Sequence, residues 1–203
     1  MKILHQFLKK EYYIPTWKIK FLFIGTFNPI CGEKVDYYYR RPSNGFWKIL
    51  EKYNTKDKFD FSTFHGIRKF MIEKEFGCID IINSVTFPDS DKNEICGIGY
   101  TDRNLFRVKN YNREYNINGL KGLIEKNDIS HIFSTWGKRD KPKEFKVIVR
   151  EINRICANKN IVFKNLSSPS GRLYRGNQKN IINNNWYGDL DDLFSGSLNQ
   201  AKR

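Results

Sequence analysis

The sequence has few cysteines, few histidines and no long hydrophobic run. Its 203 residues include 4 Cys and 3 His, and no Cys/Cys or Cys/His pair has a spacing that chelates zinc or an iron–sulfur cluster. We therefore expect four structural thiols and no metal. The longest apolar stretches, around 21–24 and 79–82, are far shorter than the roughly 20 residues of a membrane span. Residues 1–11 mix charges among apolar positions, unlike a secretory signal. These absences predict a cytoplasmic protein that does not cross a membrane.

Positive charge and aromatic side chains are abundant instead. The chain carries 36 Lys and Arg against 22 Asp and Glu, a formal net charge of +14, and 15% of its residues are aromatic. Such a surface attracts polyanions by releasing their counterions, so nucleic acid is the leading partner class. The alternative is that a Lys- and Asn-rich composition spreads its charge over solvated faces. Because hydrophobic residues occur along the whole length, we expect a monomer with one globular domain over 1–194 and a flexible tail over 195–203.

Short apolar segments alternate with segments of helical periodicity. Continuous apolar runs are typical of strands buried on both faces of a parallel sheet. The predicted strands are 19–26, 78–83, 130–135 and 160–166. The predicted helices are 1–11, 46–50, 66–76, 117–126, 143–157 and 177–193. This order predicts a three-layer α/β/α sandwich around a mainly parallel four-stranded sheet. The polar segment 88–113 is expected to be an insertion or a binding loop outside the core, which could enlarge or cover a site with Tyr100, Asp102, Arg103 and Arg107.

The loop that follows the first predicted strand has the parts of a nucleotide-binding site. In an open parallel sheet, ligands bind outside the carboxyl ends of the strands. Asn28 precedes Pro29, so its amide lies in a stiff turn where it could position a water molecule or bind a planar ligand. The run Tyr37–Tyr39 offers faces on which a base could stack, and Arg40 and Arg41 could contact phosphates. The alternative is a plain turn with tyrosines that only pack.

The loop that follows the last predicted strand is rich in small residues. After Leu166 the chain reads Ser-Ser-Pro-Ser-Gly-Arg. Backbone amides and the hydroxyls of Ser168 and Ser170 could approach a phosphate closely there, while Arg172 and Arg175 pair with it or reach into a groove. A DNA-backbone clamp is one use of such a loop, and a surface turn is the other.

Together and in this order, these segments resemble the uracil-DNA glycosylase superfamily. Gly25–Pro29 matches its first motif, a buried strand that ends in Gly-x-x-(Asn/Asp)-Pro, and Ser168–Arg172 matches its second, x-Pro-Ser-x-x. The similarity is closest to the mismatch-specific branch, which excises uracil or thymine opposite guanine. The stretch 41–47 also resembles the Pro-x-Asn-x-Phe-Trp segment that this branch shares with hypoxanthine-DNA glycosylases. The resemblance covers most of residues 19–175.

The resemblance implies base excision without a cofactor: the nucleotide is flipped out of the DNA and water cleaves its N-glycosidic bond. By analogy, Asn28 would position this water, with Asn44 as a second candidate. Asn83 would read the base edge, unless it only caps a strand. The residues that the resemblance assigns to catalysis are Asn28, Asn44 and Ser168; to the base, Phe27, Tyr38, Tyr39 and Asn83; and to DNA, Arg40, Arg41, Ser170, Gly171, Arg172 and Arg175.

Two departures from the family pattern predict a slower or differently specific enzyme. Ser168 stands where the most active uracil-specific members have a His that stabilises the departing base anion. Arg172 stands where many relatives have an apolar wedge. The target is therefore expected to be uracil, hypoxanthine, mispaired thymine or a modified base such as those of phage DNA. The competing hypotheses are a catalytically weak or inactive DNA-binding or sensing module, and a nucleotide- or RNA-processing α/β protein unrelated to repair.

Overall fold

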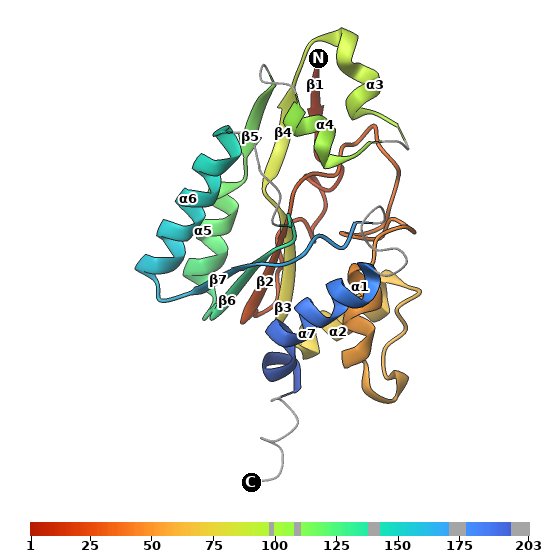
Figure 1. Cartoon of the computed structure of the whole chain (residues 1–203), viewed down its shortest axis with the longest axis vertical. Helices are drawn as coiled ribbons and strands as arrows, with labels where there is room; N and C mark the ends of the chain where they lie inside the picture. The colour runs from red at the N-terminus through yellow and green to blue at the C-terminus, as the bar shows by residue number, and fades with distance from the viewer. Residues whose placement is uncertain (98–99, 108–110, 138–142, 171–177, 196–203) are drawn as a thin grey trace.

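The computed structural model describes residues 1–97, 100–107, 111–137, 143–170 and 178–195 (Figure 1). Its central sheet has four parallel strands in the order β3-β2-β6-β7. Their bounds are β2 Phe21–Gly25, β3 Phe76–Asp80, β6 His131–Ser134 and β7 Val162–Asn165. Helices flank this sheet on both faces (Figure 1). The predicted three-layer α/β/α architecture is therefore confirmed.

Alternation of side chains along β2 supplies both halves of the core. Phe21 and Phe23 pack with α1, α2 and α7, whereas Leu22 and Ile24 pack with α5 and α6 on the opposite face (Figure 1). Successive side chains of a strand point to opposite faces, so an unbroken apolar run is stable only where both faces are covered. The helix bounds are α1 Phe46–Leu50, α2 Phe64–Glu73, α5 Ile117–Lys126, α6 Lys143–Asn158 and α7 Gln178–Ser195. Short 3₁₀ turns at Glu51–Tyr53 and Thr55–Asp57 follow α1.

A second, antiparallel sheet was not predicted. It has the order β1-β4-β5, with β1 at Lys2–Leu4, β4 at Ile82–Thr86 and β5 at Asn112–Tyr115. The helix expected over 1–11 is therefore wrong. Ile3 and Phe7, which would share one helix face, are buried in different halves of the core. Pairing with β4 supplies the hydrogen bonds of this segment, so tertiary contacts override its local periodicity.

The segment predicted as one strand over 78–83 belongs to both sheets. β3 ends at Asp80, and β4 begins at Ile82. The residue at the carboxyl end of β3 is therefore Asp80, and Asn83 lies within the antiparallel sheet. The run cannot reveal this change of sheet, because residues 78–82 are buried on both sides of it.

The segment 88–113 is more than a loop. It holds a 3₁₀ turn at Asp89–Asp91 and the short helices α3 Lys92–Ile95 and α4 Asp102–Arg107 (Figure 1). Ile95, Leu105 and Tyr111 from this segment are buried in the core, so the expectation that it lies outside the core is wrong. Among the described helices, none combines the length and apolar character that crossing a lipid bilayer requires.

Candidate functional site

Three side chains from distant parts of the chain meet at the carboxyl ends of β2 and β3. Asp80, the last residue of β3, is 2% exposed. Its Oδ2 accepts hydrogen bonds from Nδ2 of Asn28 at 2.7 Å and from Nε2 of His5 at 2.8 Å. Nδ1 of His5 accepts from the backbone N–H of Phe7 at 3.1 Å, which leaves Nε2 of the neutral ring to carry the proton. The buried pair of His5 and Asp80 thus holds the side-chain amide of Asn28, which belongs to the first motif.

This contact determines which way the Asn28 amide faces. A carboxylate only accepts hydrogen bonds, so the NH₂ group of Asn28 must face Asp80 and its Oδ1 must point away. Within the described residues, no group donates to this Oδ1. The backbone is held as well, because the Asn28 carbonyl accepts from the N–H of Gln6 at 2.8 Å. The half-buried Asn28 therefore presents one oriented acceptor.

Gly25 lets the other Asp80 oxygen approach the backbone of β2. A Cβ at this position would lie 2.1 Å from Oδ1 of Asp80 and 2.8 Å from the hydroxyl oxygen of Tyr39. Tyr39 has a left-handed backbone with φ at 60° and stacks on Phe46, with ring centroids 4.0 Å apart. Its hydroxyl is hydrogen-bonded to Thr135, just after β6, at 3.2 Å, and burial raises the pKa of Tyr39. The chain segments after β2, β3 and β6 therefore converge here.

A second carboxyl group, Asp102, lies beside this cluster. The hydroxyl of Tyr100 donates to its Oδ1 at 3.1 Å, and the Thr26 side chain is hydrogen-bonded to it too. Asp102 as a residue is exposed to solvent, but protein atoms surround its carboxyl group closely. This desolvation raises the pKa of Asp102, and the charge of Asp80 raises it further. The hydrogen bonds and Arg41 act in the opposite direction.

Arg41 contributes donors that no described residue uses. Its Nη1 donates to the Tyr100 carbonyl at 3.1 Å, and its guanidinium lies 5.2 Å from the centre of the Tyr100 ring. Nε and Nη2 are buried, and no described residue accepts a hydrogen bond from them. Buried donors without an acceptor are costly, so these nitrogens are suited to an anionic or carbonyl-bearing ligand.

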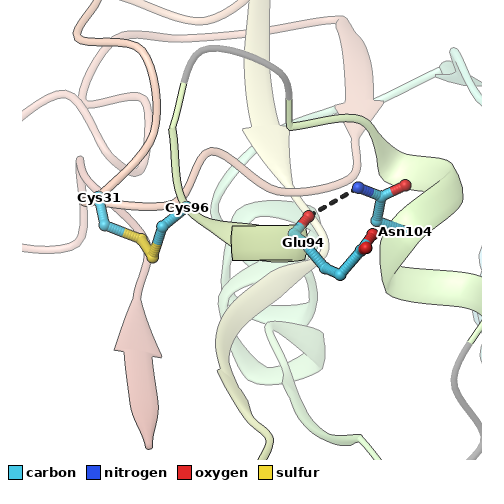
Figure 2. Close-up of a disulfide and its surroundings, with 4 residues drawn as sticks. All are labelled: Cys31, Glu94, Cys96 and Asn104. Atoms are coloured by element: carbon cyan, nitrogen blue, oxygen red, sulfur yellow. Dashed lines mark hydrogen bonds between the residues drawn. A yellow bond between two sulfur atoms is a disulfide. The ribbon is translucent and has the colours of Figure 1, made fainter. Parts of the chain in front are cut away.

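A disulfide joins the Asn28 loop to the segment that carries Asp102. Cys31 and Cys96 are bonded (Figure 2), with Cα atoms 4.9 Å apart. The Gly97 N–H donates to the Cys31 carbonyl at 2.9 Å. Asn104 of α4 donates to the Glu94 carbonyl of α3 at 2.7 Å in the same region (Figure 2). The expectation of four thiols is therefore wrong for this pair, whose 65-residue separation gave no local signal. The other two cysteines, Cys78 and Cys156, are free and buried.

The structure divides the aromatic residues that were assigned to the base. Tyr38 is fully buried, donates to the Tyr13 carbonyl at 2.9 Å and packs edge-on against Phe7. These contacts do not support a base-stacking role for Tyr38. Phe27 is 3% exposed, and its ring meets the Tyr100 ring edge-on. Tyr39 is therefore the aromatic residue whose position fits the prediction best.

Two further predicted residues are engaged elsewhere in the protein. The guanidinium of Arg40 donates to Asp36 and to the carbonyls of Phe61 and Ser62. Oδ1 of Asn83 accepts a hydrogen bond from the Tyr13 hydroxyl. Arg40 thus ties two loops together and Asn83 anchors Tyr13, so the geometry does not support phosphate contact by the one or base recognition by the other.

The third motif lies against the second. Oδ1 of Asn44 accepts from the Phe46 N–H at 2.9 Å at the start of α1, so Asn44 has a capping role there. The next N–H, that of Gly45, donates to the Pro169 carbonyl at 2.8 Å. Oγ of Ser168 accepts from the Ser170 N–H at 3.4 Å. The predicted DNA contacts Gly171, Arg172 and Arg175 lie outside the described residues.

His5 and Asp80 were missed by sequence reasoning, and Asp102 was placed only in an insertion. Asp80 had a signal, because it is the one charged residue in the apolar run Cys78–Ile82. His5 had none, because it reaches Asp80 only through the pairing of β1 with β4. Asp102 belongs to the site through tertiary contacts with Thr26 and Arg41.

Comparison with known proteins adds no relative. No protein-family model and no curated protein matches the chain. In the part of the chain that the structure describes, no three His, Cys, Asp or Glu side chains are grouped so that they could hold a metal ion. The function is therefore argued from the geometry of the site together with the three motifs.

Proposed function

We propose that the protein is a monofunctional DNA glycosylase that hydrolyses the N-glycosidic bond of a flipped-out base. Uracil, hypoxanthine and mispaired thymine are the proposed targets. The observation that carries this proposal is the amide of Asn28, which Asp80 holds by its NH₂ group, so that Oδ1 stays without a donor from any residue that the structure describes. The order of the three motifs along the chain supports the same reaction class.

The site has the parts that this hydrolysis needs. Departure of the base leaves an oxocarbenium-like sugar, which a well-placed water attacks without strong activation. Oδ1 of Asn28 would accept a hydrogen bond from this water and turn an oxygen lone pair toward C1′. The carboxylate of Asp80, held by His5 and Asn28, would lie near the developing positive charge and stabilise it electrostatically.

Basic and aromatic groups at the site suit a flipped nucleotide. Arg41 offers two buried nitrogens without an acceptor among the described residues, and the Tyr39 ring lies near Asp80. The formal charge of +14 would draw the protein to DNA and make binding strongly salt-dependent. We propose that the protein acts as a monomer in the cytoplasm.

A single-turnover excision assay tests this function. Labelled single- and double-stranded oligonucleotides would carry uracil, hypoxanthine, xanthine, a G:T mispair or a modified cytosine, and alkali would cleave the abasic sites. We expect excision of at least one base and a loss of about 10²-fold or more in Asn28→Ala, the scale for a group that positions or stabilises the transition state. Asn153→Ala, which removes an exposed amide on α6, is the matched control and should keep the full rate.

A catalytically weak DNA-binding module is the second candidate. Ser168, in place of a His that stabilises the leaving base, is the observation that favours it. Tight, salt-sensitive DNA binding without excision of any base in the panel would support this candidate and overturn the enzyme. Excision that survives unchanged in Asn28→Ala would overturn the role of the amide.

A further inference from the structure

The three motifs supply no side chain that could readily protonate the departing base. When the C1′–N bond breaks, its electron pair stays on the base, which leaves faster if it is protonated at the same time. Ser168 has a hydroxyl that remains protonated at neutral pH and is a poor acid for this step. An acid at this end of the reaction must therefore come from elsewhere in the chain.

We propose that the carboxyl group of Asp102 is the general acid that gives a proton to the departing base. This assignment rests on the proposed glycosylase activity. It concerns a residue in the segment 88–113, which lies between the first and second motifs and outside both.

The hydrogen bonds of Asp102 connect its carboxyl group to the site. Thr26 binds it from the residue after β2 and Tyr100 from its own segment. Thr26 is two residues from Asn28, and the Tyr100 ring meets the ring of Phe27 between them. The Asn28 amide and the side chain of Thr26, which binds the Asp102 carboxyl group, thus belong to one stretch of three residues at the end of β2.

The two carboxyl groups of the site have opposite surroundings. Asp80 accepts hydrogen bonds from His5 and Asn28 on one oxygen. Desolvation and the charge of Asp80 raise the pKa of Asp102, which favours its protonated form. The other charged or titratable groups that interact with Asp102 are Arg41, Tyr100 and Tyr39. A carboxyl group whose surroundings raise its pKa is suited to act as a general acid in a hydrolase.

The step balances without a further reactant. The Asp102 proton moves to a ring nitrogen or carbonyl oxygen of the base as the C1′–N bond breaks and its electron pair goes to the base. The water held by Asn28 adds its oxygen to C1′ and releases a proton to solvent, and solvent returns one proton to the Asp102 carboxylate. The net change consumes one water and yields the free base and an abasic site.

The pH dependence of excision by Asp102→Asn tests the assignment. An acid must be protonated to act, so the wild-type rate should fall as pH rises through the raised pKa of Asp102. In Asp102→Asn we expect a loss of about 10²-fold, the lower end for general acid catalysis, together with the disappearance of this limb. Asparagine can still accept from Thr26 and Tyr100, so folding and DNA affinity should be retained. Asp192→Asn, an exposed carboxyl on α7, is the matched control.

Leaving-group dependence gives a second readout that a structural role would not change. If uracil is excised, 5-fluorouracil is the matched substrate, because its anion is more stable and needs less protonation. Asp102→Asn should then lose far less on 5-fluorouracil than on uracil. An equal loss on both, or an unchanged pH profile, overturns the role of Asp102 while Asn28-dependent excision keeps the proposed function. No excision by the wild type overturns the proposed function itself, and this assignment with it.

Discussion

Asp80 and Asp102 are held at the same site by different means. Asp80 ends a central parallel strand, and the Asn28 loop beside it is fastened by backbone hydrogen bonds from the N-terminal segment. Asp102 begins a helix of six residues that side-chain contacts and the Cys31–Cys96 bond hold in place. The difference teaches that the carboxylate that holds the water-positioning amide is part of the sheet, whereas the proposed acid is connected to the sheet only through side-chain contacts and a disulfide.

The surroundings of Asp80, at the end of β3, should be more sensitive to added side-chain volume than those of Asp102. In Gly25→Ala the new methyl group would overlap Oδ1 of Asp80, so either the carboxylate or the strand must move. We expect the largest effect here: excision falls by about 10³-fold, the scale of a lost transition-state contact, and the free energy of unfolding falls by about 1–3 kcal/mol. Single-turnover kinetics and urea denaturation measure the two.

Gly122→Ala is the control for this substitution. A Cβ at Gly122, within α5, meets no atom within 4 Å, and alanine favours a helix over glycine by about 1 kcal/mol. This variant should be as active as the wild type and slightly more stable. Equal losses in both glycine variants would contradict the close approach of Asp80 to β2.

Asp80→Asn should weaken catalysis by releasing the Asn28 amide. An asparagine at this position can no longer accept from both His5 and Asn28 with a full charge, so the amide loses its fixed orientation. We expect excision to fall by about 10–10²-fold and the free energy of unfolding by about 1–3 kcal/mol, the cost of an impaired buried hydrogen bond. Because Asp80 is proposed to act both by holding Asn28 and by its own charge, the double variant with Asn28→Ala should be slower than Asn28→Ala alone, but by less than the full loss in Asp80→Asn. Fully additive losses would show that the two act independently.

Removing the Cys31–Cys96 disulfide should lower the stability of the protein more than it lowers the rate of excision. The disulfide links residues 65 positions apart and so restricts the conformations of the unfolded chain. Replacing both cysteines by serine, or reducing them, removes this restriction and should lower the free energy of unfolding by about 2–4 kcal/mol. Excision should fall by less than in Asp80→Asn, since Thr26 and Tyr100 still hold Asp102. Denaturation with and without reductant measures the effect, and the double serine variant should not respond to reductant. An unresponsive wild type would mean that the bond contributes nothing, or is absent in cytosol-like conditions.

The smallest expected effect is the change in the free energy of unfolding caused by Asp102→Asn. Because the pKa of Asp102 is raised in the folded protein, its ionised form is less favourable there than in the unfolded chain. This carboxyl therefore lowers stability as pH rises through its folded pKa. Asp102→Asn should be as stable as the wild type near pH 3 and slightly more stable near pH 7, in contrast to the loss in Asp80→Asn. Thermal unfolding at the two pH values checks the sign, and a destabilised Asp102→Asn at pH 7 would contradict it.

Local patterns were sufficient for the parallel sheet and most helices. The predicted helix over 117–126 has the bounds of α5, and the run 19–26 contains β2, because an amphipathic stripe and a doubly buried strand each have a distinct periodicity. The same reasoning failed at 1–11, where a helical pattern forms a strand. Short segments have weak local preferences, so a partner distant in sequence decides their structure.

The candidate site shows the same division. The sequence by itself determined that Asn28 follows a buried strand and that a basic, aromatic loop comes next, since both features depend on neighbours in the chain. Only the tertiary structure decided that His5 and Asp80 hold this amide, that Arg40 and Tyr38 are occupied elsewhere, and that Asp102 joins the site. The physical reason is that hydrogen bonds and burial depend on which groups meet in space, and sheet pairing and the Cys31–Cys96 bond bring together residues that no local pattern connects.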